Sequence, residues 1–376
     1  MRIVVDGRLD ASAATGVASY ARAVHEGLSA IGRAPLILDD ATHGQFGTPS
    51  PPLARAWRGV RGSVPLAIRL SERGGRLMAR DVFRLAQARF ALTGRLLRLT
   101  APGPPGVMHW TYPIPARIEG WRNVYTVHDV IPLLDAGFSP IDPERLRRQL
   151  AAVAAGADRI VTVSQWARGS IIDTLALDPA QVTDCGLAVA GMSPADALLP
   201  GGLARDGYFL FCGLTEPRKN LDRIIAGWAA SGSGRPLVVV GPDAASIAPR
   251  AGLVALPYQP RGVLIDLIAG ARALVFATLE EGFGLPIAEA MTLGTPVITS
   301  DRGAPLEVTG GAALTVDPAD VAQIAAAIAR LDQSDDLCAA LKARGLERAV
   351  AFTAAAFGVR LAALYDEFAG DSRMSG

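Results

Sequence analysis

Two acidic and two basic residues follow apolar runs in the second half of the chain. Glu281 and Glu289 come after the run at 273–277, and Arg218 and Lys219 follow an earlier one. Carboxylates can accept hydrogen bonds from sugar hydroxyls, and adjacent cations can neutralise a diphosphate whose charge grows as a bond to it breaks. These side chains therefore indicate a site for a ligand that carries both hydroxyl and phosphate groups.

The segment around the two glutamates has the pattern of a strand, a tight loop and a short helix. Pro286 suits the first helical turn, where its missing N–H costs nothing, and Gly294 ends the helix. Gly282 and Gly284 let the backbone approach a ligand, and N–H groups at the helix start can receive phosphate or hydroxyl oxygens. Ligands of open α/β sheets gather at such strand ends.

Each pair also has an ordinary structural explanation. Glu289 could stabilise the dipole of its helix, and Glu281 could be a loop charge. Arg218 and Lys219 could be solvent-exposed cations beside a helix start, since such side chains are seldom buried. The functional interpretation depends on finding both pairs at strand ends of one domain. We therefore predict that they converge on one site.

Residues 208–318 alternate β-rich runs with helical patterns, which is typical of a parallel sheet covered by helices on both faces. Most of the runs are almost continuously apolar, which indicates burial on both faces. The predicted strands are 209–212, 237–240, 254–256, 273–277, 296–300 and 313–316. The predicted helices are 221–230, 263–271 and 286–293, with another beginning at Asp320.

The first half of the chain contains similar runs, so a second α/β domain is expected. Residues 190–207 are rich in Gly and Pro without clear periodicity, as in an interdomain linker. The predicted strands of the first half are 3–6, 107–110, 124–128 and 159–164. The expected layout is an N-terminal domain at 1–190, a linker at 191–207, a C-terminal domain at 208–352 and a helix at 353–376 that crosses back to the N-terminal domain.

Residues 51–100 form a basic arm, with eleven arginines against Glu72 and Asp81. From 77 to 99, apolar residues recur at spacings that fit an amphipathic helix, as in elements that lie on a membrane surface. A helical insertion packed on the N-terminal sheet explains the same pattern. The sequence leaves both interpretations open.

Composition limits the class of protein. The 37 Lys and Arg residues nearly balance the 36 Asp and Glu residues, which gives no general argument for nucleic-acid binding. Cys185, Cys212 and Cys338 are far apart and fit reduced thiols better than a disulfide framework or a zinc site. The chain opens directly on a strand pattern and has no apolar run of about 18 residues, so we expect a cytoplasmic protein that does not cross a bilayer.

Two further features lie in the first half. His128 ends the apolar pattern at 124–127 and precedes Asp129, which could orient the imidazole or cap the next turn. Gly16 and Val17 follow the first predicted strand, where backbone N–H groups of a glycine loop could reach a phosphate. The simpler explanations are a structural histidine and an ordinary tight turn into a helix.

These segments together resemble family 4 of the retaining glycosyltransferases, which share a two-domain fold called GT-B and include many bacterial mannosyltransferases. The resemblance covers most of the chain except the basic arm and the C-terminal tail. It implies an α/β fold of two Rossmann-like domains whose parallel sheets face each other across a cleft. The matching segments, in the expected order, are Gly16-Val17-Ala18-Ser19-Tyr20, His128-Asp129, Val163-Ser164, Glu216-Pro217-Arg218-Lys219-Asn220 and Glu281 to Glu289.

The resemblance implies a role for each candidate residue. The catalytic group would be His128, Glu281, Arg218 and Lys219. Arg218 and Lys219 would bind the donor diphosphate, assisted by Gly16, Val17 and the N–H groups of Phe283, Gly284 and Leu285. Glu289 would bind the ribose. Glu281 and His128 would contact the transferred sugar.

One residue departs from the family pattern. Many relatives have an arginine immediately after the glycine that corresponds to Gly213, but this chain has Leu214. We expect Arg218 to compensate for the missing charge. The family generally works without a bound metal, and no Asp-x-Asp triplet lies near a predicted site, so we expect neither a metal nor a cofactor.

The function implied is transfer of a hexose, mannose or a related sugar, from a nucleoside diphosphate sugar to an acceptor hydroxyl with retention of configuration. A GDP-linked donor is preferred because the 216–220 segment resembles that of bacterial mannosyl- and rhamnosyltransferases of polysaccharide assembly; UDP-sugars stay open. The basic arm suggests a lipid-linked or polysaccharide acceptor at the cytoplasmic face of the inner membrane, in cell-surface glycan biosynthesis such as that of lipopolysaccharide. The alternative is a catalytically silent GT-B scaffold subunit, against which the intact Glu281, Glu289 and Lys219 argue.

Overall fold

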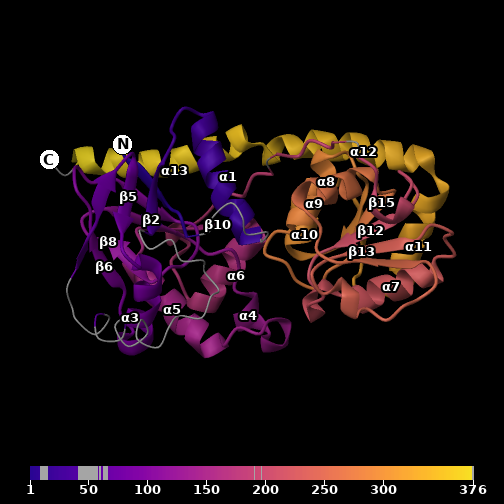
Figure 1. The fold of residues 1–376 in the computed structure, drawn as a ribbon, viewed down its shortest axis with the longest axis horizontal. Helices are drawn as coiled ribbons and strands as arrows, with labels where there is room; N and C mark the ends of the chain where they lie inside the picture. The colour runs from indigo at the N-terminus through magenta and orange to yellow at the C-terminus, as the bar shows by residue number, and fades with distance from the viewer. Residues whose placement is uncertain are drawn as a thin grey trace.

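The chain forms two α/β lobes that lie side by side along the long axis of the molecule (Figure 1). Each lobe has its own large sheet. The last helix, α13 (Ala354–Met374), runs back along the N-terminal lobe (Figure 1). The computed structural model describes residues 1–8, 16–40, 58, 61, 67–189, 191–195 and 197–374.

The N-terminal lobe is built on an eight-stranded sheet with the order β11-β10-β9-β7-β1-β2-β5-β4. Neighbouring strands are parallel except for the antiparallel pair β4 and β5. All residues of β1 and β7 are buried, as expected of inner strands of a sheet covered on both faces. The strands are β1 (Ile3–Asp6), β2 (Leu36–Asp40), β4 (Ser71–Arg73), β5 (Arg76–Ala79), β7 (Val107–Trp110), β9 (Arg122–Thr126), β10 (Arg159–Thr162) and β11 (Val182–Asp184).

A three-stranded parallel sheet completes the strands of this lobe in the described residues. It consists of β3 (Ile68–Arg69), β6 (Leu97–Thr100) and β8 (Ala116–Ile118). The helices of the lobe are α1 (Gly16–Ala30), α3 (Val82–Thr93), α4 (Ile131–Leu134), α5 (Pro143–Gly156) and α6 (Gln165–Leu175), with 3₁₀ turns η1 (Ala136–Phe138) and η2 (Pro179–Gln181).

The C-terminal lobe has a six-stranded, fully parallel sheet with the order β14-β13-β12-β15-β16-β17. This is the strand order of a Rossmann fold, in which the direction of strand addition reverses between β12 and β15. The strands are β12 (Phe209–Cys212), β13 (Leu237–Val240), β14 (Leu253–Leu256), β15 (Ala273–Phe276), β16 (Val297–Ser300) and β17 (Leu314–Val316).

Helices cover both faces of the second sheet. The helices are α7 (Leu221–Ala230), α8 (Arg261–Gly270), α9 (Leu285–Thr292), α10 (Gly303–Thr309), α11 (Val321–Gln333) and α12 (Asp335–Ala349), with 3₁₀ turns η3 (Pro200–Gly202), η4 (Pro217–Lys219), η5 (Ala244–Ser246) and η6 (Val350–Phe352). The predicted fold class is confirmed, and the predicted strands of both halves and the predicted helices of the second half agree with these bounds to within two residues at each end. The three cysteines are free thiols, as predicted.

One sequence prediction about the basic arm is wrong. The amphipathic pattern from 77 to 99 does not form one helix, because Arg76–Ala79 pairs with β2 as strand β5 and Leu97–Thr100 pairs with β3 and β8 as strand β6. Only α3 is helical, and Gly94 ends it in a left-handed conformation. The apolar side chains of the segment, such as Phe83 and Leu85, are buried in the core of the lobe.

The packing inside the lobe decides between the two interpretations of the arm. An apolar face that fills a protein core cannot also insert into a membrane. The interpretation of residues 77–99 as a helix on a membrane surface is therefore wrong, and the segment instead packs on the N-terminal sheet. Residues 51–57, 59–60 and 62–66 of the arm lie outside the described residues.

The C-terminal helix α13 joins the two lobes. It packs along α1, where a Cβ atom at Gly358 would lie 2.0 Å from the carbonyl oxygen of Gly27. Phe357, Leu361 and Tyr365 of α13 are buried in the same hydrophobic cluster as residues of both sheets. The core is therefore continuous from one lobe to the other.

The helical stretch Asp335–Ala369 is, by length and composition, apolar enough to cross a membrane. It is interrupted at η6, and 44% of its most apolar window is buried inside the protein. A single stretch of this kind is weak evidence for a membrane span, because core helices of globular proteins meet the same criterion.

Candidate active site

Glu281 holds both predicted cations. Its Oε1 atom lies 2.5 Å from Lys219 Nζ, and its Oε2 atom lies 3.1 Å from Arg218 Nη1. Arg218 also pairs with Glu216 through Nη2 at 2.8 Å. Glu281 and Lys219 are 6% and 8% exposed, so this is a largely desolvated charge network in which the geometry of each side chain is fixed by the others.

Backbone contacts bring the two cations to Glu281. Arg218 and Lys219 lie in η4, at the end of the loop that follows the central strand β12. The carbonyl oxygen of Arg218 accepts a hydrogen bond from the N–H of Leu279, which follows β15, at 2.7 Å. The amide of Asn220 donates to the carbonyl oxygens of Ala277 and Pro318. Two loops that are about 60 residues apart in sequence are thus tied together at the carboxyl ends of adjacent strands.

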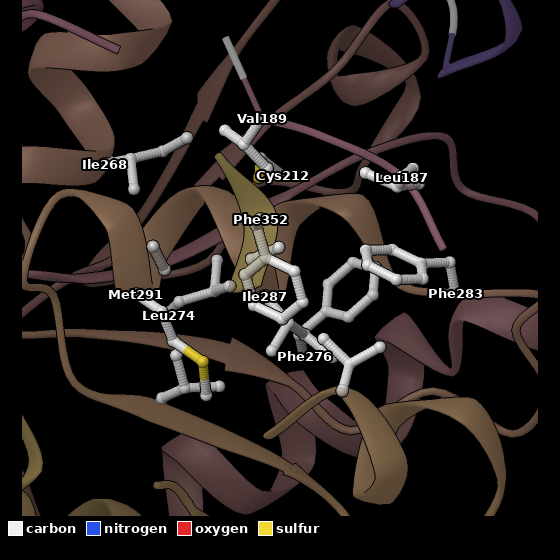
Figure 2. Packing of buried hydrophobic residues seen from close by; sticks show 14 of the residues in the cluster. Leu187, Val189, Cys212, Ile268, Leu274, Phe276, Phe283, Ile287, Met291 and Phe352 are labelled. Atoms are coloured by element: carbon white, nitrogen blue, oxygen red, sulfur yellow. The ribbon is translucent and has the colours of Figure 1, made fainter. Parts of the chain in front are cut away.

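Glu289 lies on α9, the helix that follows the Glu281 loop. Burial raises the pKa of its carboxyl group, while the guanidinium of Arg261, 2.6 Å away, lowers it. The opposite face of α9 is anchored by Ile287 and Met291, which point into the core (Figure 2). The carboxylate is buried on the face of α9 that points away from these two side chains, where Arg261 reaches it.

The start of α9 offers backbone donors. Gly284 is its N-cap residue in a left-handed conformation, with φ at 91°. Leu285, the first residue of the helix, carries an N–H group that has no intrahelical acceptor. Pro286 has no N–H, and the N–H of Ile287 donates to the carbonyl oxygen of Gly284 at 2.9 Å. The ring of Phe283 is buried and makes an edge contact with the ring of Phe352, with centroids 5.8 Å apart (Figure 2). This contact holds the loop before α9 against the hydrophobic core.

His128 follows β9 in the N-terminal lobe. Its Nε2 atom lies 3.1 Å from the carbonyl oxygen of Thr111, and the ring of Tyr20 meets it edge-on with centroids 4.7 Å apart. Burial lowers the pKa of His128 to about 4, so the imidazole is neutral near pH 7. Because a carbonyl oxygen only accepts, Nε2 carries the proton and Nδ1 is free to accept a hydrogen bond.

The residue after His128 caps the next turn. Asp129 Oδ1 accepts a hydrogen bond from the N–H of Ile131 at 3.1 Å, which matches the capping role that the sequence left open. Burial raises the pKa of the Asp129 carboxyl group, the hydrogen bond from Ile131 and the charge of Arg218 lower it, and the charge of Glu281 raises it. Asp129 therefore lies within electrostatic reach of the charge network of the other lobe.

The two lobes meet at this point. A Cβ atom on Gly282 would lie 2.9 Å from the carbonyl oxygen of His128, and Ser164 Oγ donates to the carbonyl oxygen of Gly282 at 2.6 Å. The structure therefore brings His128 together with Glu281, Arg218 and Lys219, at the carboxyl ends of strands from both sheets.

Gly16 and Val17 are the first residues of α1. Gly16 is exposed and Val17 is half-buried. Among the described residues, no hydrogen bond links either of them to the C-terminal lobe, and residues 9–15 of the preceding loop lie outside the described residues. Their implied contact with the donor stays a prediction.

The structure adds residues that the motifs did not single out. Both carboxylate oxygens of Glu307, on α10, accept backbone N–H groups at the start of α6, from Gln165 and Trp166 at 2.8 Å each. Trp166 Nε1 donates to Glu280 at 2.7 Å. These contacts join segments more than 110 residues apart, so no local sequence pattern could have revealed them.

No group of three or more His, Cys, Asp or Glu side chains in the described part of the chain is arranged to hold a metal ion. Metal independence stays a prediction that an activity measurement has to test.

Sequence comparison connects this site to known proteins. The family model described as "Glycosyl transferases group 1" matches residues 203–348, which include the loops of both cations and both glutamates. The O-antigen chain mannosyltransferase B of Escherichia coli is 32% identical over 262 residues, covering 64% of this chain and 68% of that protein. The O-antigen chain mannosyltransferase RfbU of Salmonella typhimurium is 28% identical over 227 residues, covering 57% and 62%.

Structural comparison covers nearly the whole chain. The sucrose-phosphate synthase from Thermosynechococcus elongatus aligns with 99% of this chain and 100% of its own, with a TM-score of 0.69 and 19% identity. That likeness shows the same two-domain arrangement. With the family model, the mannosyltransferase relatives and the position of the charged site, it shows that the chain belongs to glycosyltransferase family 4 and has the GT-B fold.

Proposed function

We propose that this glycosyltransferase is a retaining, metal-independent hexosyltransferase that uses a nucleoside diphosphate sugar, with a GDP-linked donor preferred. One observation carries the proposal: Glu281 fixes Arg218 and Lys219 at the carboxyl end of the second sheet, in a loop whose Gly282 contacts the backbone of His128 in the other lobe. Such a site combines the cations that a diphosphate needs with two acceptors for sugar hydroxyls, the Glu281 carboxylate and the neutral His128 imidazole.

Each side chain has a distinct task in the proposed reaction. Arg218 and Lys219 bind the diphosphate and stabilise the charge that develops on it as the bond to the sugar breaks. Glu281 orients both cations and accepts a hydroxyl of the transferred sugar. His128 accepts another hydroxyl through Nδ1, since its Nε2 proton is held by Thr111.

The proposed transfer occurs on one face of the sugar. The bond between C1 and the phosphate oxygen breaks, its electron pair stays on the phosphate, and the acceptor oxygen bonds to C1 from the same side. The departing phosphate takes the proton of the acceptor hydroxyl, so the products are a glycoside and a nucleoside diphosphate. No carboxylate then has to act as a covalent nucleophile, which suits a Glu281 that is already engaged by two cations.

The sugar and the acceptor are proposed from the relatives. Two of them are named as O-antigen chain mannosyltransferases, so we infer mannose or a related hexose as the transferred group and a lipid-linked or polysaccharide acceptor in cell-surface glycan biosynthesis. The protein would act in the cytoplasm, at the inner face of the membrane.

The proposed binding to the membrane surface rests on charge alone. The described part of the basic arm keeps exposed arginines on its surface, among them Arg69, Arg73, Arg80 and Arg95. Anionic lipid attracts such side chains, and salt screens the attraction. Co-sedimentation with phosphatidylglycerol vesicles that is lost between about 0.05 and 0.5 M salt would support this part of the proposal, and equal recovery with neutral vesicles would contradict it.

The test of the proposed function begins with nucleotide binding. GDP and UDP should each be titrated while the melting temperature is followed, because a ligand of the native state raises its stability. Product release should then be measured with a panel of GDP- and UDP-sugars, with and without chelator. Failure of both nucleotides to raise the melting temperature would overturn the donor site, and binding without turnover on any acceptor would favour the scaffold alternative.

A further inference from the structure

Arg261 occupies an unusual position for a cation. It is the first residue of α8, where Pro260 is the N-cap and provides no side-chain cap. A positive charge at the N-terminus of a helix is opposed by the helix dipole. A cation at this unfavourable position is expected to have a partner that offsets the cost, or a functional role.

The compensating partner is Glu289. Arg261 Nη2 lies 2.6 Å from Glu289 Oε1, and the carboxylate is 3% exposed while the arginine side chain is 39% exposed. The partly exposed guanidinium of Arg261 thus pairs with one oxygen of the buried Glu289 carboxylate. In the described residues, Glu289 makes no other ion pair.

A second contact holds the guanidinium from the linker side. Arg261 Nη2 also lies 3.0 Å from Sδ of Met192, in the segment that joins the lobes. Planar guanidinium groups keep a fixed direction when they are held from two sides, which an ammonium cannot do equally well. The direction of the Glu289 carboxylate is therefore set by the linker, α8 and α9 together.

We propose that Arg261 is a positioning residue of the nucleotide site: it holds Glu289 by Oε1 so that Oε2 accepts a ribose hydroxyl of the nucleoside diphosphate. This inference rests on the proposed function, because it requires a nucleotide whose ribose reaches Glu289. The nucleotide then binds to a carboxylate that is already oriented, without an ordering cost at the moment of binding.

Arg261 has a second effect on Glu289, through charge. Burial raises the pKa of this carboxyl group and Arg261 lowers it. Among the described residues, the thiol of Cys212 at the end of β12 also interacts electrostatically with Glu289, and the same thiol senses Lys219 of η4. Without Arg261, Glu289 would take up a proton at higher pH, and the neutral carboxyl group is a weaker acceptor for the ribose hydroxyl than the carboxylate. Ribose binding by such a variant should therefore weaken as the pH falls.

The experiment compares nucleotides that differ only in the ribose. Dissociation constants should be measured by calorimetry for GDP and 2′,3′-dideoxy-GDP, or for the uridine pair if UDP binds more tightly. The proteins are wild type, Arg261→Met, Arg261→Lys and Glu289→Gln, each at pH 6, 7 and 8. Arg250→Met serves as the matched control, because Arg250 is exposed and precedes β14 in the same lobe.

We expect Arg261→Met to weaken the ribonucleotide about tenfold, as for loss of a hydrogen bond to a charged group, and most at pH 6. The dideoxy nucleotide should change by less than about twofold, Arg261→Lys should recover part of the loss, and Arg250→Met should match wild type.

The possible failures are distinguishable. An equal loss for both nucleotides would mean that Arg261 binds phosphate or supports the fold, and an unchanged affinity for both would mean that it has no role; either result overturns the inference. If wild type binds neither GDP nor UDP, the proposed function itself is wrong, whatever Arg261 does.

Discussion

A Cβ atom on Gly282 would lie 2.9 Å from the carbonyl oxygen of His128 and 2.9 Å from Cβ of Asp129. Loops from opposite lobes are therefore in close contact beside the charge network, with Gly282 against His128 and Asp129. Gly282→Ala should force them apart by a few tenths of an ångström, because the His128 oxygen belongs to the main chain and Cβ of Asp129 is bonded directly to it. We expect kcat to fall about tenfold or more, since small displacements at a reacting centre are costly.

The control for this substitution is Gly169→Ala. Gly169 lies in α6, and nothing lies within 4 Å of its added Cβ atom. This variant should keep wild-type turnover and gain up to about 1 kcal/mol of stability from the better helix propensity. If Gly282→Ala also turns over at the wild-type rate, the close contact between the loops has no catalytic consequence.

Neutralising Glu281 should separate donor binding from transfer. In Glu281→Gln, Lys219 and Arg218 lose the carboxylate that now pairs with them and are free to bind phosphate. We expect the dissociation constant for the nucleoside diphosphate to stay the same or to decrease, while the transfer rate falls about a hundredfold. Lys219→Met should instead weaken nucleotide binding and slow transfer.

The chain offers matched controls for both variants. Glu347 and Lys342 are exposed on α12, away from the charge network. Glu347→Gln and Lys342→Met should leave both the dissociation constant and the rate unchanged. A Glu281→Gln protein that transfers sugar at the wild-type rate would contradict the role assigned to this carboxylate.

The sequence predicted the C-terminal lobe more fully than the N-terminal one, for a physical reason. Buried parallel strands such as Leu237–Val240 are short, apolar on both faces and bounded by helical patterns, so their local pattern has one good explanation. The segment 77–99 does not have this property. Leu97 and Leu99 fit a strand and a helix equally well, and pairing with β3 and β8 decides the outcome.

The candidate site also combines features that the sequence could predict with features that it could not. Arg218, Lys219 and Glu281 could be identified because each lies next to a strand end in a short motif. The pairing of Glu281 with both cations could not, and neither could the Arg261 contact with Glu289, because side-chain partners from different loops depend on tertiary packing. The pattern therefore predicted which residues meet but not how their charges are paired.

Glu307 should matter for transfer and not for nucleotide binding. Its carboxylate crosses from α10 to the start of α6 and accepts two N–H groups, as an acidic residue does at a helix N-terminus. Glu307→Ala should lower the free energy of unfolding by about 1 kcal/mol, because the contact is partly solvent-exposed. Nucleotide affinity should stay within about twofold, because the proposed donor site lies in the C-terminal lobe, while turnover should fall.

Nucleotide affinity by calorimetry and turnover should be measured on the same preparation of Glu307→Ala, with Glu347→Ala as the control. If nucleotide affinity falls as much as turnover, Glu307 supports the fold of its own lobe and not the junction between the lobes.

Acid should destabilise the protein through His109. This side chain is fully buried, with Nδ1 2.5 Å from the hydroxyl of Tyr365 in α13 and Nε2 2.7 Å from Oγ1 of Thr126. Burial lowers the pKa of His109 to about 3, whereas an unfolded histidine titrates near 6.5. Between these values the unfolded chain binds a proton that the folded protein does not, so stability must fall as the pH falls from about 6.5 toward 3.

His109→Gln isolates this contribution. The variant loses the hydrogen bonds of His109 with Tyr365 and Thr126. It should therefore be less stable than wild type at pH 8, by about 1 to 3 kcal/mol. It also loses the titrating group, so its free energy of unfolding should depend less steeply on pH, by up to about 1.4 kcal/mol per pH unit. Urea unfolding at pH 8, 6.5, 5.5 and 4.5 measures both effects. Parallel curves for the two proteins would show that His109 does not carry the acid sensitivity, because only a group whose pKa differs between the folded and unfolded states can make the curves converge.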